Sequence, residues 1–118
     1  MSGNERRAHQ RFEIQLGAEI RTAERSFSAA TKDVSVGGAC IEGPYALEET
    51  SAIDLDLFVV VDGVEEAGFP PLTVRARVQW TAETDDPAVA WRNLAGLRFE
   101  ELDEAKRQWL ERVLARTS

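Results

Sequence analysis

Two short clusters of polar residues in this sequence are suited to bind an anion or a base. Arg7 and Arg11 are separated by three residues, and Asp33, Ser35 and Gly38 follow later as Asp-x-Ser-x-x-Gly. An arginine guanidinium donates two parallel hydrogen bonds to a phosphate or to the O6 and N7 acceptors of guanine. An ionised aspartate only accepts, so Asp33 can take the N1 and N2 protons on the other edge of guanine. Together the clusters predict a site for a guanine nucleotide.

The second cluster also contains two adjacent glycines. Gly37 and Gly38 carry no side chain, which lets a base or ribose approach the backbone, and Ser35 can donate or accept a hydrogen bond. Either cluster alone carries little information, because Arg-x-x-x-Arg arises by chance in charged segments and Asp-x-Ser-x-x-Gly is a common turn. The interpretation therefore depends on whether the fold brings the two clusters together.

The spacing of apolar residues predicts the elements that hold these clusters. Apolar side chains occupy every second position in residues 11–21, and a second strand follows at 26–34 after a polar turn. Further strands are predicted at 39–41, 52–61, 72–80 and 95–99. Five or six strands joined by short links in fewer than 100 residues predict a small antiparallel barrel or sandwich.

The end of the chain changes period. Apolar residues then recur every three or four positions, which predicts a helix at about 103–116 packed on the barrel, with Asp103 as its N-cap and Trp109 in its apolar stripe. Strands one and two would pair antiparallel, so the start of the first lies beside the end of the second. The two polar clusters are therefore predicted to be neighbours in space.

Length and composition predict one domain. The chain has 118 residues, 43% of them hydrophobic; residues 1–11 are interpreted as a flexible arginine-rich arm and 12–118 as a single domain. No apolar run approaches the roughly 20 residues of a membrane helix, and residues 1–10 lack the apolar stretch of a secretory signal. We therefore expect a cytoplasmic location without membrane insertion. The single Cys40 is expected to be a small buried thiol.

The distribution of charge narrows the class of ligand. A net charge of -7 argues against DNA binding, and it also disfavours a small barrel for single-stranded nucleic acid. Residues 1–32 carry six basic and four acidic side chains, whereas the rest carry eight basic and seventeen acidic. This suits capture of a compact anion at one place, although a solvated tail explains the charge equally well. No nucleophile motif or metal-ligand cluster is present in the sequence, so we expect neither catalysis nor a metal.

In this strand order the two clusters resemble the PilZ family. Residues 5–11 (ERRAHQR) match its arginine motif and residues 33–38 (DVSVGG) its turn motif. Residues 74–80 (VRARVQW) are similar to its late strand, and residues 95–102 (AGLRFEEL) to its last strand entering the C-terminal helix. The resemblance covers nearly the whole chain, with the loops at 43–52 and 62–71 least diagnostic. It implies a mainly β fold, a six-stranded antiparallel β-barrel with a C-terminal helix packed on it.

The resemblance also implies a ligand, the bacterial second messenger cyclic di-GMP. Arg7 and Arg11 would wrap the arm around it, while Asp33, Ser35, Gly37 and Gly38 would hold a guanine on the barrel surface. In this family an arginine at the position of Arg6 accompanies binding of two stacked ligand molecules, so that mode is expected here. Trp80 is a further candidate beside the base, although a half-buried core position is at least as well supported.

The function implied is that of a non-enzymatic receptor or adaptor, with no cofactor other than this ligand. Binding would order the arm and alter contact with an unidentified effector protein, with motility, pilus or exopolysaccharide-type outputs. The alternative is a PilZ-fold interaction module that does not depend on cyclic di-GMP. Family members of that kind usually lack parts of the two motifs, whereas this chain keeps both.

Overall fold

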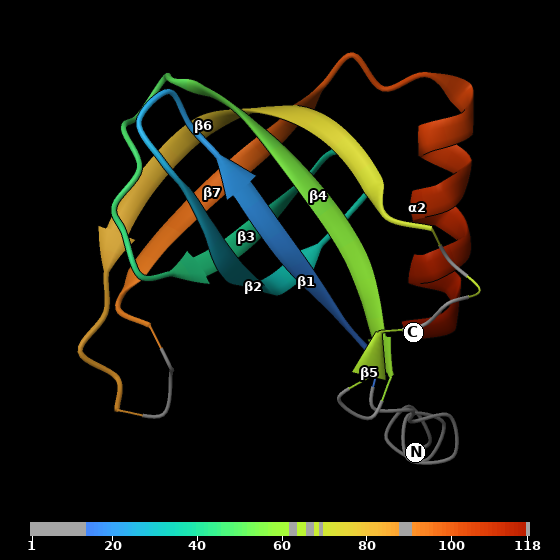
Figure 1. Ribbon diagram of the computed structural model, residues 1–118, viewed down its shortest axis with the longest axis horizontal. Helices are drawn as coiled ribbons and strands as arrows, with labels where there is room; N and C mark the ends of the chain where they lie inside the picture. Colours follow the sequence, from blue (N-terminus) through green and yellow to red (C-terminus); the bar gives the residue numbers. More distant parts are fainter. Residues whose placement is uncertain (1–13, 62–63, 66–67, 69, 88–90, 118) are drawn as a thin grey trace, which may run out of the picture.

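In the described part of the chain, six strands form a closed antiparallel barrel and a C-terminal helix packs against it (Figure 1). The computed structural model describes residues 14–61, 64–65, 68, 70–87 and 91–117. The elements in chain order are β1 (Ile14–Arg21), β2 (Ser26–Val34), β3 (Gly38–Gly43), β4 (Ala52–Val61), β5 (Val64–Glu65), β6 (Leu72–Glu83), β7 (Asn93–Glu100) and α2 (Glu104–Thr117).

The strands follow the order β1-β2-β3-β7-β6-β4, and β4 pairs back onto β1 to close the ring. The two-residue β5 only extends β4 as a short hairpin. The predicted six-stranded barrel with a C-terminal helix is confirmed, and the bounds of β2 and β4 agree with the predicted strands. The sequence did not predict β5, and β6 continues past Trp80 to Glu83.

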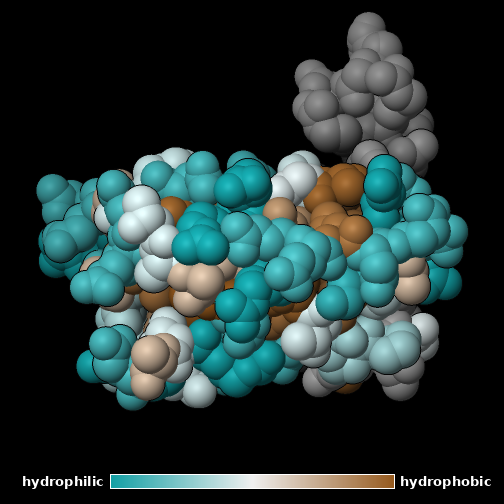
Figure 2. Space-filling model, turned by 90° about the horizontal axis from the view of Figure 1, so that it is seen from above, coloured by the Kyte–Doolittle hydropathy of each residue, from teal (hydrophilic) through white to brown (hydrophobic). Residues whose placement is uncertain are grey.

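Alternating side chains fill the barrel interior. The side chains of Ile20, Leu55 and Leu57 are fully buried. On the neighbouring β6, Val74 and Val78 are at most 1% exposed. Period-2 alternation sends the intervening residues outward, which leaves the outer face mostly polar. Figure 2 shows this on one face, where hydrophilic side chains dominate and apolar ones appear in small groups.

The helix begins at a capped N-terminus. The backbone N–H of Lys106 donates to Asp103 Oδ1 at 2.9 Å, so Asp103 is the N-cap as the sequence predicted. Trp109, Leu110 and Val113 join the barrel core, and the Trp109 indole N–H donates to the Pro70 carbonyl at 2.8 Å. Figure 1 shows α2 at the end of the barrel where β1 and β6 begin, and α2 contacts both of these strands.

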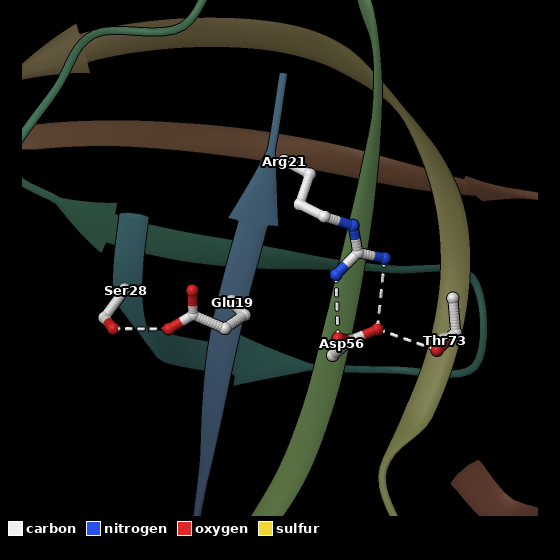
Figure 3. Close-up of polar contacts among 5 residues, drawn as sticks. All are labelled: Glu19, Arg21, Ser28, Asp56 and Thr73. Carbon is white, nitrogen blue, oxygen red and sulfur yellow. Dashed lines mark hydrogen bonds and ion pairs between the residues drawn. The ribbon is translucent and has the colours of Figure 1, made fainter. Parts of the chain in front are cut away.

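A polar cluster ties β1, β4 and β6 together on the outer face (Figure 3). The two terminal nitrogens of Arg21, Nη1 and Nη2, donate to the Asp56 carboxylate at 2.7 and 3.2 Å. The Thr73 hydroxyl donates to the same carboxylate at 2.7 Å. The hydrogen bond from Arg21, with help from Thr73, lowers the pKa of Asp56 below its ordinary value. The folded chain therefore stabilises the ionised form of Asp56 more than the unfolded chain does.

We expect Asp56→Asn to lower the urea midpoint of unfolding at pH 7. A lowered carboxyl pKa contributes stability above the unfolded value and loses it as the pH falls through the folded value. The difference between variant and wild type should therefore shrink below about pH 4, which urea titrations at several pH values measure. Asp54→Asn is the matched control, since Asp54 has a longer ion pair, 3.4 Å to Arg75 Nε, and its midpoint should change less. A difference that stays constant down to pH 2 would contradict the explanation.

Candidate functional site

The strand register puts four residues in one row across four neighbouring strands. Asp33 on β2 pairs with Cys40 on β3, Cys40 pairs with Gly96 on β7, and Gly96 pairs with Trp80 on β6. Strands lie about 4.8 Å apart, so the three steps of this row span about 14 Å. A carboxylate stands at one end and an indole at the other, with small residues between them. We call these four residues the outer row.

A β-bulge in β2 turns Asp33 to the outside. Thr31 pairs with the buried Ile41, whereas Asp33 pairs with Cys40, so two steps along β2 match one step along β3. Regular alternation would place Asp33 on the same face as Thr31 and Ile41, toward the core. The extra residue shifts the alternation by one, which is how bulges re-aim side chains beside functional sites.

A second bulge, in β6, does the same for Trp80. Val78 pairs with Leu97 in the core, but Trp80 pairs with Gly96, so Gln79 is the extra residue. The alternative of a half-buried core position for Trp80 is wrong, because the side chain faces outward and is 43% exposed. Its indole lies directly on Gly96, where an added Cβ would come within 2.1 Å of Nε1. Gly96 therefore provides the space in which the indole rests.

The outer row forms part of an open depression of about 390 Å³. Its lining consists of Asp33, Ser35, Gly37, Gly38, Ala39, Cys40, Gln79, Trp80, Gly96, Leu97 and Arg98. The structure thus brings together five of the predicted site residues, those of the turn motif and Trp80. Arg6, Arg7 and Arg11 lie outside the described residues. A second depression, of about 440 Å³ between residues 22–27 and 45–53, contains none of the predicted site residues that the structure describes.

The turn between β2 and β3 is held by its own backbone. The Ser35 N–H donates to the Gly38 carbonyl at 2.8 Å, the Gly37 N–H donates to Ser35 Oγ at 3.2 Å, and the Phe99 N–H donates to the Gly37 carbonyl at 2.9 Å. Gly38 belongs to β3, and a Cβ there would lie 2.0 Å from the Leu97 carbonyl oxygen. At Gly37 the nearest atom would be Ser35 Oγ at 3.9 Å. Gly38 is therefore required by strand packing, whereas Gly37 borders open space.

Cys40 forms the floor of the depression. The expectation of a buried thiol is wrong. Cys40 pairs with Asp33 on the outer face of the barrel, where its side chain is half-buried. Burial raises the pKa of the Cys40 thiol above its ordinary value, and the nearby negative charge of Asp33 raises it further. The thiol is thus protonated at neutral pH and adds no charge to the site.

Sequence reasoning missed Cys40, Gln79, Gly96 and Arg98 as lining residues of the depression. The alternation of the last strand already puts Gly96 and Arg98 on the outer face, opposite the buried Leu97 and Phe99. The residues that lie beside them on β3 and β6 are set by the order of the strands and by the bulges. The apolar pattern of a single strand does not predict either. Among the described residues no group of three His, Cys, Asp or Glu side chains could hold a metal ion. In the same part of the chain, no helix is long and apolar enough to cross a membrane.

Solved structures with the same architecture are numerous. The PilZ domain of YcgR from Escherichia coli, with c-di-GMP, gives a TM-score of 0.64 at 13% identity over 91% of this chain and 89% of that chain. MrkH from K. pneumonia, in its c-di-GMP complex, gives 0.66 at 13% identity over 89% and 47%. MotI (DgrA), an inhibitor of motility from Bacillus subtilis, gives 0.65 at 12% identity over 90% and 49%. These identities establish a shared fold.

The extent of the match differs among these proteins. This chain spans about half the length of MotI and MrkH but nearly the whole of the isolated YcgR domain. Comparison with curated protein sequences gave no match. The model of one sequence family, the PilZ domain, matches residues 5–116, which is nearly all of the barrel and helix together with the segment before β1. The chain therefore belongs to the PilZ domain family.

Proposed function

We propose that this chain is a non-enzymatic receptor for cyclic di-GMP and that the depression on the outer face of the barrel is its binding site. The outer row is the observation that carries the proposal, because it sets a hydrogen-bond acceptor and an aromatic plane at two ends of one open floor. The YcgR domain and MrkH, which share this fold, have been solved with c-di-GMP.

Asp33 supplies the selectivity for guanine. Its exposed carboxylate accepts the N1–H and N2–H donors of the base, and the adjacent Ser35 hydroxyl offers one more donor or acceptor. Adenine presents an acceptor at N1 and has no amino group at C2. An adenine nucleotide would thus leave Asp33 facing an acceptor without a proton between them, which costs binding energy.

The length of the outer row favours a dinucleotide over a mononucleotide. Because the Trp80 indole lies on Gly96, about two strand spacings, or about 10 Å, separate the strand that holds Asp33 from the indole, which is more than one purine covers. A ligand with two bases can contact both ends. The exposed indole of Trp80 then offers its plane to the second base or to the sugar.

We propose that the arginine arm reaches this site from the start of β1. β1 begins at Ile14 and runs antiparallel to β2, with Gly17 opposite Ala30, and the Thr31 hydroxyl donates to the Leu16 carbonyl at 2.7 Å. The first residues of β1 therefore lie toward the part of β2 that leads to Asp33. Arg11 is three residues before Ile14, within about 10 Å of extended chain. We propose that Arg7 and Arg11 contact the ligand from the side opposite the barrel, and that Arg6 supports a second, stacked ligand molecule.

The proposed output is a changed contact with an effector protein in the cytoplasm. Ordering of residues 1–11 around the ligand would present a new surface beside the depression, a switch that needs no chemistry in the barrel. Motility, pilus and exopolysaccharide systems are the outputs that the resemblance implies. The competing proposal, an interaction module indifferent to cyclic di-GMP, predicts a partner whose affinity does not change when the ligand is added.

Calorimetric titration of the full chain with cyclic di-GMP, and separately with cyclic di-AMP, tests the proposed receptor function. We expect binding of cyclic di-GMP at least about 100-fold tighter than of cyclic di-AMP, because only guanine donates two protons to Asp33. A stoichiometry of two ligands per chain would support the stacked mode, and one would reject it. Absence of heat and of any competition at physiological ligand concentrations would reject the receptor function itself.

Trp80→Ala is expected to weaken cyclic di-GMP binding roughly tenfold, because stacking of a base on an aromatic side chain contributes about 1–3 kcal/mol. In the wild type the ligand should also quench tryptophan fluorescence through the exposed indole of Trp80. Trp91→Phe, which changes a partly buried tryptophan packed against the core, is the control and should keep both the affinity and the quenching. Quenching that survives in Trp80→Phe but disappears in Trp91→Phe would contradict this role.

A further inference from the structure

Only one cationic side chain lines the depression among the described residues, that of Arg98 on β7. Of the described residues in the same lining, Asp33 alone is anionic. Without Arg98, the described floor would present a net negative charge to a ligand with two phosphates. We propose that Arg98 binds a phosphate of the cyclic dinucleotide. This inference rests on the proposed receptor function and adds a residue that belongs to neither polar cluster of the sequence.

The position of Arg98 fits this role. It lies two residues from Gly96 on the same outward face of β7, and it pairs with Gly38 on β3. Because Gly38 has no side chain, nothing at that position of β3 stands between Arg98 and the turn that carries Ser35. The guanidinium can thus reach over β3 along the edge of the outer row, where the ribose-phosphate ring of a ligand with its base at Asp33 would lie.

The contacts of Arg98 leave it available. Glu100 accepts a hydrogen bond from Arg77 Nε at 3.2 Å, and Arg77 Nη1 also donates to the Thr50 carbonyl at 2.9 Å. Arg98 Nη2 is 3.8 Å from the same Glu100 oxygen, beyond hydrogen-bond distance, and its side chain is 60% exposed. Glu100 therefore keeps a partner when Arg98 turns toward a ligand. Arg77 is therefore held by shorter contacts, whereas Arg98 makes only the longer ion pair with Glu100.

Guanidinium and phosphodiester are well matched. The planar fork can donate two parallel hydrogen bonds to two phosphate oxygens, and a lysine at the same place could supply charge but not this geometry. The phosphodiester is charged throughout the physiological pH range. Since the site is open to solvent, salt should screen the attraction.

Calorimetry with cyclic di-GMP compares wild type, Arg98→Gln, Arg77→Gln and Arg98→Lys at several NaCl concentrations. We expect Arg98→Gln to bind at least about tenfold more weakly with a shallower salt dependence, and Arg98→Lys to recover part of the affinity. Arg77→Gln removes the other arginine on Glu100 but does not line the depression, so its affinity should stay within about twofold of wild type. Thermal unfolding by circular dichroism checks that each variant is folded.

The outcomes separate this inference from the function on which it rests. Wild-type affinity and salt dependence in Arg98→Gln would overturn the role of Arg98 and leave the receptor function intact. An equal loss in Arg77→Gln would also overturn it, because the effect would then come from the contacts around Glu100. If Arg98→Gln is unfolded, the Arg98→Lys variant provides the test. Wild-type affinity and wild-type salt dependence in Arg98→Lys would reject the bidentate phosphate contact. Absence of binding by the wild type would reject the receptor function first.

Discussion

Asp33→Ala is expected to weaken cyclic di-GMP binding about 100-fold or more while leaving the stability of the barrel nearly unchanged. The carboxylate would otherwise accept two protons from one guanine, and hydrogen bonds to a charged group contribute about 1.5–3 kcal/mol each. The residue is exposed on the outer face, so its loss should remove little from the folded core. Isothermal calorimetry measures the affinity, and urea unfolding measures the stability of the same preparations.

A second acidic residue provides the control for this prediction. Asp54 also lies on the outer face, but on β4, away from the outer row, and Asp54→Ala should bind cyclic di-GMP like the wild type. The preference for cyclic di-GMP over cyclic di-AMP should narrow in Asp33→Ala and persist in Asp54→Ala. Retained affinity and retained preference in Asp33→Ala would show that guanine is read elsewhere.

The second large effect concerns the fold. Gly38→Ala should lower the free energy of unfolding by about 3 kcal/mol, because the new Cβ would sit 2.0 Å from the Leu97 carbonyl oxygen. The obstacle is backbone of the paired strand β7, so relief requires β3 and β7 to separate rather than a side chain to turn. Chemical denaturation measures the loss.

Gly37→Ala is the matched control, one residue away in the same turn. Its Cβ would meet nothing closer than Ser35 Oγ at 3.9 Å, so we expect a change of stability within about 0.5 kcal/mol. Ligand binding is a separate measurement on the same two variants. If Gly38→Ala unfolds at the wild-type midpoint, the motif glycine would have to be explained by the ligand instead of by strand packing.

Much of the fold could be predicted from the sequence because its strands alternate cleanly. In β4 the buried Ile53, Leu55, Leu57 and Val59 occur at every second residue, and the predicted bounds agree with the structure. The N-cap at Asp103 was also predictable, since it depends on residues within one turn of each other. Such local features need no knowledge of which strands pair.

The bulges show where sequence prediction reached its limit. In β2 the apolar spacing lengthens by one between Thr31 and Val34, a visible sign of the extra residue that turns Asp33 outward. In β6, Val78 and Trp80 continue the alternation without interruption, so the sequence favoured a core-facing tryptophan. What turns Trp80 outward is a shift in pairing with β7 and the space above Gly96, both set by a strand that begins ten residues after β6 ends.

Cys40 and Arg98 illustrate the same limit in the candidate site. Flanking apolar residues predicted burial for Cys40, but its partners in the pairing are Asp33 and Gly96 on the outer face. Nothing in the sequence distinguishes Arg98 from the other charged residues, and only the strand pairing shows that it lies beside Gly38. Identity and spacing indicated the ligand class, whereas the membership of the site depended on the order of strands around the barrel.

The filled interior of the barrel limits how a bound ligand can be sensed. Ile20, Leu55 and Leu57 are fully buried inside the ring of strands, and close-packed interiors resist deformation. A ligand on the outside therefore rests on a stiff support and gains nothing from rearranging it. Any partner that distinguishes the loaded from the empty protein is expected to touch the nucleotide itself, or chain segments outside the ring of strands.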